Sequence, residues 1–247
     1  MRLTTDERTI NYMKKRIAGA GSIVAILGVE MLVESGGYDL DANDQTYRVE
    51  DEYGYSPEDM LTTSFFNARV EKFFTFYKRE VVGMQVRSTP AYDALLKLQA
   101  QGKLSAVVSR NYHGLPAGVP LRNVIEYNGN MHVNHCPRCG RRYELAYIRS
   151  SRGIPLCEDC KTAIRPGIRL LGERADTTLM TKAALACERA DVLLILGRNM
   201  YADRFEYSIG LDKKQLRVLF SKETALSDQK VDFIIRDEIQ IILPLIV

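Results

Sequence analysis

The stretch Ser22-Ile-Val-Ala-Ile-Leu27, which ends at Gly28, is a short continuous run of apolar residues. A strand buried on both faces, as in a parallel sheet, has this pattern because neither face meets water. Three later runs are similar, and a shorter one is a candidate fifth strand: residues 104–108, 192–196, 216–220 and 232–235. The sequence therefore predicts a parallel sheet whose strands are fully covered.

Helical patterns separate these strands. Residues 6–20 place apolar side chains on one helical face behind Asp6, which is a favourable N-cap residue. Residues 89–102 begin with Thr89-Pro90 and stop at Gly102, and residues 177–190 form a third helical pattern. Strands that alternate with helices predict an α/β fold with a Rossmann-like, doubly wound parallel sheet.

A helical insert around residues 56–86 begins at Ser56-Pro57, where the serine caps the helix and the proline takes its first position. The segment is rich in aromatic residues: Phe65, Phe66, Phe73, Phe74, Phe76 and Tyr77. We expect it to cover the sheet as part of the large lobe.

Residues 134–165 interrupt this alternation and carry four of the five cysteines, as Cys136-Pro-Arg-Cys139 and Cys157-Glu-Asp-Cys160. Seventeen residues, 140–156, separate the two pairs, which is within the range of four-cysteine zinc sites. Four thiolates complete a tetrahedron, so we expect one structural Zn²⁺ ion and no catalytic metal. Sheet-forming sequence resumes afterwards, which indicates a small zinc-ribbon-like module inserted between residues 1–133 and 166–247 of a larger lobe.

Composition excludes several classes of protein. The chain has 247 residues, enough for one large domain with an insert, and its net charge of only +3 indicates no broad basic face for nucleic acid. No apolar run approaches the ~18 residues of a membrane span, and the N-terminal residues contain no apolar signal core. We therefore expect a soluble, cytoplasmic protein. The fifth cysteine, Cys187, has apolar helical neighbours and is predicted to be a core residue.

Four segments around the cysteines are similar to motifs of one family. They resemble, in chain order, L-T-G-A-G-I-S-A-E-S-G, N-V-I-E-L-H-G, L-R-P-x-V-V-x-F-G-E and the strand before a G-T-S loop. In this chain they are residues 26–36, 123–129, 164–173 and 190–197. The chain therefore resembles the sirtuins, the NAD-dependent protein deacylases, over nearly its whole length.

This resemblance implies that NAD lies between a Rossmann-like large lobe and a small lobe that holds the zinc. It also implies a partner, an acyl-lysine protein or peptide, that enters the same cleft. In the family the acyl oxygen attacks the nicotinamide ribose while a histidine acts as general base. The products are the deacylated lysine, nicotinamide and an acyl-ADP-ribose.

The NAD-binding motifs are altered in this chain. The positions that the resemblance assigns to the cofactor are Gly28, Val29, Glu30, Arg110, Asn111, Gly197, Arg198 and Asn199. Glu30 replaces the second glycine of G-A-G and brings a negative charge to the place where backbone amides meet the pyrophosphate. In the D-F-R-G motif Asp39 is kept, but Asp41 replaces the arginine. Arg198 replaces the threonine of G-T-S, where it would either meet a phosphate or block the ribose.

The catalytic positions are altered as well. The family's catalytic histidine falls on Asn128, whose amide cannot accept a proton at neutral pH, and loss of a positioned base typically costs ~10²–10⁴-fold in rate. The Q-N-x-D motif appears as Arg110-Asn111-Tyr112-His113. Asn111 is kept, and His113 is a candidate substitute base; the alternative is a solvent-exposed or structurally bonded loop histidine. Arg169 stands where the family usually has valine, in the segment that contacts the substrate.

Three functions remain open from the sequence. The first is deacylation with a substitute base, and the second is ADP-ribosyl transfer or NAD cleavage, which depends less on that base. The third is a non-catalytic protein that binds a nucleotide or another protein. Several altered motifs in one cleft favour a protein whose standard deacylase activity is weak or lost.

Overall fold

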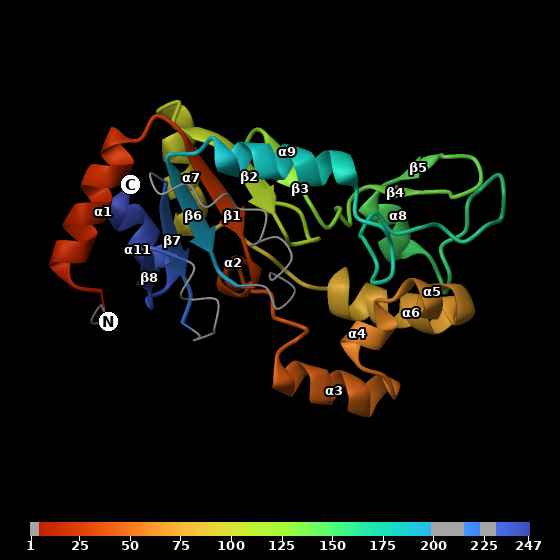
Figure 1. The fold of residues 1–247 in the computed structure, drawn as a ribbon. Helices are drawn as coiled ribbons and strands as arrows, with labels where there is room; N and C mark the ends of the chain where they lie inside the picture. The colour runs from red at the N-terminus through yellow and green to blue at the C-terminus, as the bar shows by residue number, and fades with distance from the viewer. Residues whose placement is uncertain (1–4, 199–214, 223–230) are drawn as a thin grey trace.

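The computed structural model describes residues 5–198, 215–222 and 231–247 (Figure 1). Its centre is a six-stranded sheet with the order β3-β2-β1-β6-β7-β8, in which every neighbouring pair is parallel. The strands are β1 (Ile23–Leu27), β2 (Leu104–Ser109), β3 (Val124–Glu126), β6 (Val192–Leu196), β7 (Leu216–Phe220) and β8 (Phe233–Ile235). All five predicted runs are strands of this sheet, and of the six strands in the sheet only the short β3 was not predicted.

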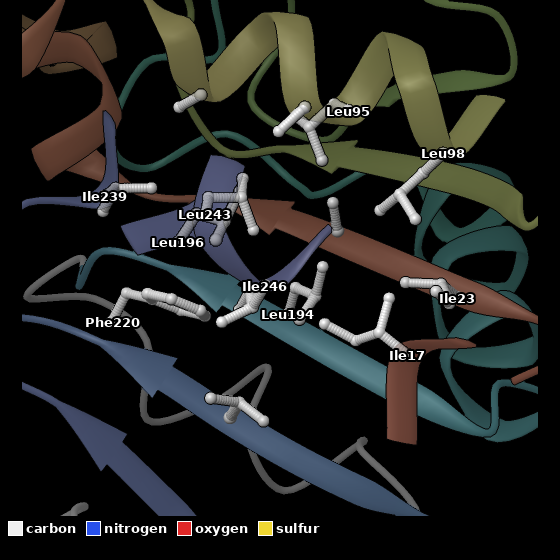
Figure 2. Packing of buried hydrophobic residues seen from close by; sticks show 14 of the residues in the cluster. Ile17, Ile23, Leu95, Leu98, Leu194, Leu196, Phe220, Ile239, Leu243 and Ile246 are labelled. Atoms are coloured by element: carbon white, nitrogen blue, oxygen red, sulfur yellow. The ribbon is translucent and has the colours of Figure 1, made fainter. Parts of the chain in front are cut away.

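Helices cover both faces of the sheet (Figure 1). One face is covered by α1 (Glu7–Gly19), α2 (Val29–Glu34), α7 (Pro90–Ala100) and α11 (Ile239–Ile246), and the other by α9 (Thr177–Glu188). Central strand β1 is fully buried, with Ile23, Ala25 and Leu27 in the first core and Val24 and Ile26 in the second. Figure 2 shows side chains of the first core converging from helices and strands. The predicted doubly wound α/β fold is confirmed.

The connections fix where a ligand can bind. Strand β1 continues to β2 on one side of the sheet, while β6 joins β1 from the other side. The chain order therefore reverses between β1 and β6, and crevices of parallel sheets open at the carboxyl ends of strands beside such a reversal. Among the described residues, no helix has both the length and the apolar character needed to cross a membrane.

A second group of elements lies beside the sheet (Figure 1). It consists of α3 (Asn43–Tyr53), α4 (Pro57–Met60), α5 (Thr63–Ala68), α6 (Val70–Phe76), a π-helix (Tyr77–Val81), α8 (Leu145–Ser150) and the two-stranded β4 (Asn134–His135) and β5 (Arg142–Tyr143). The fully buried rings of Phe73, Phe74 and Phe76 share one hydrophobic cluster with Cys136 and Ile148 of the cysteine module. The expectation that this aromatic segment covers the sheet is wrong, because its rings are buried against the cysteine module. The module's limits at residues 134 and 165 stay a prediction.

A buried carboxylate ties α3 to the π-helix. Glu80 is 2% exposed and accepts hydrogen bonds from the hydroxyls of Tyr38 at 2.8 Å and Tyr53 at 2.9 Å, and from the guanidinium of Arg48. Burial opposes ionisation of Glu80, but the bonds from Arg48, Tyr38 and Tyr53 outweigh burial and lower the pKa of Glu80. The ionised carboxylate therefore stabilises the fold.

Replacing Glu80 tests this network. Because the pKa is lowered, the stabilisation is present above the unfolded pKa of about 4.3 and is lost as pH falls through the folded pKa. We expect Glu80→Gln to reduce the free energy of unfolding by about 2–4 kcal/mol at pH 7 and by less near pH 3. Urea denaturation at pH 7 and pH 3 measures the free energy of unfolding. The control is Glu50→Gln, at an exposed position of α3. An equal loss at the two pH values would contradict the ionised network.

Candidate functional site

The four paired cysteines converge on one point. The Sγ atoms of Cys136, Cys139, Cys157 and Cys160 all lie within 4.8 Å of one another. Cys139 Sγ and Cys157 Sγ are 3.7 Å apart. This is far longer than a disulfide bond of about 2.05 Å, but it matches the edge of about 3.8 Å in a tetrahedron with Zn–S bonds of about 2.3 Å. The predicted ligand set is confirmed, and its all-sulfur chemistry suits zinc.

Two similar turns present these thiols. The amide of Gly140 donates to the carbonyl of Cys136 at 2.9 Å, and the amide of Lys161 donates to that of Cys157 at 2.9 Å. Gly140 and Lys161 both have positive φ, as such tight turns require. The hydroxyl of Tyr143 donates to Cys157 Sγ at 3.2 Å and is the main reason that the pKa of this thiol falls to about 6. Cys187 lies apart from this cluster in the sheet core, as predicted.

A cavity of about 740 Å³ lies at the carboxyl ends of strands β1, β2 and β3. Val29 follows β1, Arg110 and Asn111 follow β2, and Asn128 follows β3, and all four line this cavity. A later segment, residues 168–175, lines it too. The structure therefore brings together the predicted residues that follow β1, β2 and β3.

Asn128 is held on both sides of its amide. Its Nδ2 donates to the carbonyl oxygen of Arg110 at 2.8 Å, and its Oδ1 accepts from the guanidinium of Arg169 at 3.0 Å. The Arg169 guanidinium also lies over the ring of Tyr127, 5.5 Å from its centroid. Asn128, which the resemblance aligns with the family's catalytic histidine, is thus a neutral amide that faces a cation.

His113 also lines the cavity and is only 1% exposed. A hydrogen bond with the backbone of Val81 favours the protonated form of its imidazole. Its ring stacks on that of Tyr112 with centroids 4.7 Å apart. Burial lowers the pKa of His113 to about 4, so the imidazole is neutral at pH 7. His113 is therefore not the solvent-exposed loop histidine that the sequence left open, since it is buried in the wall of the cavity.

The remaining predicted cofactor residues form a closed loop beside β1. The side chain of Glu30 accepts hydrogen bonds from the backbone amide of Arg198 and from the hydroxyl of Ser221, the latter at 2.7 Å. The Arg198 side chain also reaches Ser221, with Nε 2.9 Å from Oγ. A Cβ on Gly28 would lie 2.3 Å from the carbonyl oxygen of Gly197, so this approach requires a glycine. Of the described loop residues, Gly28, Glu30, Gly197 and Arg198 do not line the cavity, and Asn199 lies outside the described residues.

Acidic residues also line the cavity. They are Asp39, Asp41, Glu58 and Glu173, and Glu173 forms an ion pair with Arg165. Burial raises the pKa of Asp41 to about 6, and the charges of Asp39 and Glu58 add to this shift. Sequence reasoning missed Glu58 and Ser221, because neither belongs to a motif that places it near the cleft.

The comparisons identify the family. The model of the Sir2 family matches residues 30–202. The chain belongs to the sirtuins. An NAD-dependent protein deacetylase of Clostridium acetobutylicum is 31% identical over 231 residues, which are 93% of this chain and 94% of that protein. One of Clostridium tetani is 31% identical over 236 residues, 95% of this chain and 96% of that protein.

Solved structures agree on the fold. A structure of Sir2 with p53 peptide and NAD+ has a TM-score of 0.80 at 21% identity and covers 95% of both chains. Sir2 bound to acetylated peptide has a TM-score of 0.79 at 21% identity with the same coverage. The cysteine cluster of this chain is the four-cysteine zinc site typical of sirtuins.

Removal of one zinc ligand should separate this site from the fifth cysteine. We expect wild-type protein to retain about one zinc ion per chain after dialysis, and Cys139→Ser to lose most of it and unfold at lower temperature, because three thiolates leave the tetrahedron incomplete. Cys187→Ala, which removes a buried thiol outside the cluster, should keep the metal. Mass spectrometry measures the zinc content per chain of both variants. Full zinc content in Cys139→Ser would contradict the assignment of Cys139 as a zinc ligand.

Proposed function

We propose that this sirtuin descends from NAD-dependent protein lysine deacylases and that its standard deacylase activity is weak or lost. The observation that carries this proposal is the setting of Asn128, held between the carbonyl of Arg110 and the guanidinium of Arg169. A general base needs a lone pair that binds a proton near neutral pH, and an amide has none. The guanidinium beside it disfavours the arrival of a second positive charge.

His113 does not make good this loss. A general base works best when its pKa lies near the working pH, and burial lowers the pKa of His113 to about 4. Its nitrogens lie in a site that water barely reaches, since the side chain is 1% exposed. Deacylation with His113 as substitute base is therefore the weaker proposal.

The loop around Glu30 supports the same conclusion at the cofactor. A phosphate-binding loop works by offering free backbone N–H groups to an anion. Here the N–H of Arg198 already donates to the Glu30 carboxylate, which Ser221 also holds. The pyrophosphate of NAD carries negative charge and would have to displace this internal carboxylate. The residues present therefore fit NAD poorly.

The hydrogen bonds of this loop also bear on the alternative functions. ADP-ribosyl transfer and NAD cleavage both require bound NAD, so a closed loop opposes them as much as it opposes deacylation. A non-catalytic protein that binds a partner or another ligand has no such requirement. We therefore take the non-catalytic function as the second candidate, with an acyl-lysine peptide or protein among its candidate partners, as in the Sir2 structure with acetylated peptide.

Calorimetry with NAD tests the loop. We expect little or no binding by the wild type and at least about tenfold tighter binding by Glu30→Gly, because the Arg198 amide becomes available and a negative charge is removed. Glu30→Gln keeps the size of the side chain without its charge, so it separates bulk from electrostatics. Micromolar binding of NAD by the wild type would refute this role of Glu30.

An acetylated peptide with NAD tests the catalytic position. Asn128→His alone should restore little turnover, because Arg169 would lower the pKa of the new imidazole. The double variant Asn128→His with Arg169→Val should be more active, and a Glu30→Gly background more active still. The rate of nicotinamide release measures the turnover of the wild type and of each variant. Robust turnover by the wild type would end the proposal of weak or lost activity.

A further inference from the structure

The four zinc ligands differ in their exposure to solvent. Cys136 and Cys157 are 0% exposed, whereas Cys139 is exposed and Cys160 is partly exposed. Four thiolates around one divalent ion leave a net negative charge on the site. Water can solvate the exposed thiolates, but a buried thiolate depends on hydrogen bonds from the protein, because burial of a charge without partners costs free energy. The two buried sulfurs therefore need donors from the chain.

Donors reach both buried sulfurs. The amide of Arg138 donates to Cys136 Sγ at 3.4 Å, and backbone amides of its own turn donate to the sulfur of Cys157. Cys157 Sγ also accepts from the hydroxyl of Tyr143, at 3.2 Å, and this residue lies on β5, which follows the other pair of cysteines. The backbone donors come with the turns themselves, whereas this hydroxyl depends on the side chain at position 143.

The hydroxyl of Tyr143 is held in place from several sides. Its oxygen accepts from the amide of Glu158 at 2.9 Å, which leaves the phenolic proton for the sulfur of Cys157. The Tyr143 side chain is buried, and its ring packs on that of Tyr147 with centroids 4.7 Å apart. One phenol therefore joins β5 to a zinc ligand and to the residue after that ligand.

Arg141 makes a second link between the two pairs of cysteines. Its guanidinium forms ion pairs with Glu158 at 3.1 Å and with Asp159. Exposed ion pairs contribute little to stability, and here 43% of the arginine side chain and 61% and 54% of the two acidic side chains are exposed. Neither ion pair includes a sulfur atom. Arg141 therefore joins the same two segments as Tyr143 does, without contact between its guanidinium and a zinc ligand.

We propose that Tyr143 is a positioning residue for the zinc ion: its hydroxyl holds Cys157 as a metal-binding thiolate and slows the loss of zinc from the module. A hydrogen bond to a thiolate offsets part of its charge and favours this form over the thiol. Residues that hydrogen-bond to metal ligands typically change the metal affinity by about 10–100-fold. The proposal concerns the zinc module alone and does not depend on whether the cleft binds NAD.

Tyr143→Phe tests the proposal, because it removes the hydroxyl and keeps the ring. We expect this variant to bind zinc about tenfold or more weakly than the wild type and to lose it faster to a chromogenic chelator. The matched control is Tyr147→Phe, since the hydroxyl of Tyr147 donates to the carbonyl oxygen of Leu156 at 2.7 Å, in the same segment as Cys157. Tyr147→Phe and Arg141→Gln should retain zinc much as the wild type does.

Cobalt(II) in place of zinc separates a contact with the sulfur from a general loss of stability. Thiolate-bound cobalt has a sulfur-to-metal charge-transfer band, and loss of a hydrogen bond to the sulfur lowers the energy of this band. We expect the band of Tyr143→Phe at longer wavelength than that of the wild type, and the band of Tyr147→Phe unchanged. Incorporation of 3-fluorotyrosine at position 143, a more acidic phenol and so a stronger donor, should move the band to shorter wavelength and slow metal release. This replacement keeps the hydroxyl, so its result does not depend on how well Tyr143→Phe folds.

Two results would overturn the proposal. One is a zinc affinity of Tyr143→Phe equal to that of the wild type. The other is an equal loss of zinc affinity in Tyr143→Phe and Tyr147→Phe with the cobalt band unmoved in both variants and in the fluorotyrosine protein, because a purely structural role of the two rings predicts that outcome.

Discussion

Strand β1 is paired along both edges and buried on both faces, and the rest of the site depends on this constraint. A strand held in this way fixes the point at which the chain leaves the sheet, at Gly28. The loop there touches the loop after β6 so closely that no Cβ fits on Gly28. The side chain of residue 30 therefore lies next to Gly197 and Arg198. The architecture of the loop therefore sets which residues lie next to the side chain of residue 30.

The group of elements beside the sheet is stabilised by different interactions from the sheet itself. Its aromatic cluster, centred on Phe73 and Tyr77, packs against the cysteine module, and the carboxylate of Glu80 joins α3 to the π-helix. Zinc binding contributes folding free energy to such a module outright. These interactions make no use of the cleft residues Asn128 or Glu30. Changes in the cleft can therefore accumulate while the zinc site and its core stay intact, which is why the zinc site says much about fold and little about chemistry.

The sequence predicted the sheet well because a strand covered on both faces must be apolar throughout. It missed β3, since three residues after Asn123, which has a φ of 50°, form too short a run to show a pattern. It assigned the aromatic segment to the wrong surface, because composition gives the amount of apolar area and not the neighbour that buries it. The four cysteines were found by spacing alone. The contact of Ser221 with Glu30 could not be predicted from the sequence, because the two residues are 191 positions apart in the chain.

Two substitutions in the cleft change its charge in the same direction. On the motif resemblance, Glu30 stands in place of a glycine and Asp41 in place of an arginine. A sirtuin that had lost only its base would gain nothing from either change, because NAD would still need its phosphates neutralised. Glu30 lies in a loop where it accepts hydrogen bonds from the Arg198 amide and the Ser221 hydroxyl, and Asp41 lines the cavity. A carboxylate at either position opposes the pyrophosphate of a dinucleotide, so the loop at Glu30 and the amide at Asn128 support the same proposal, that standard NAD-dependent turnover is weak or lost.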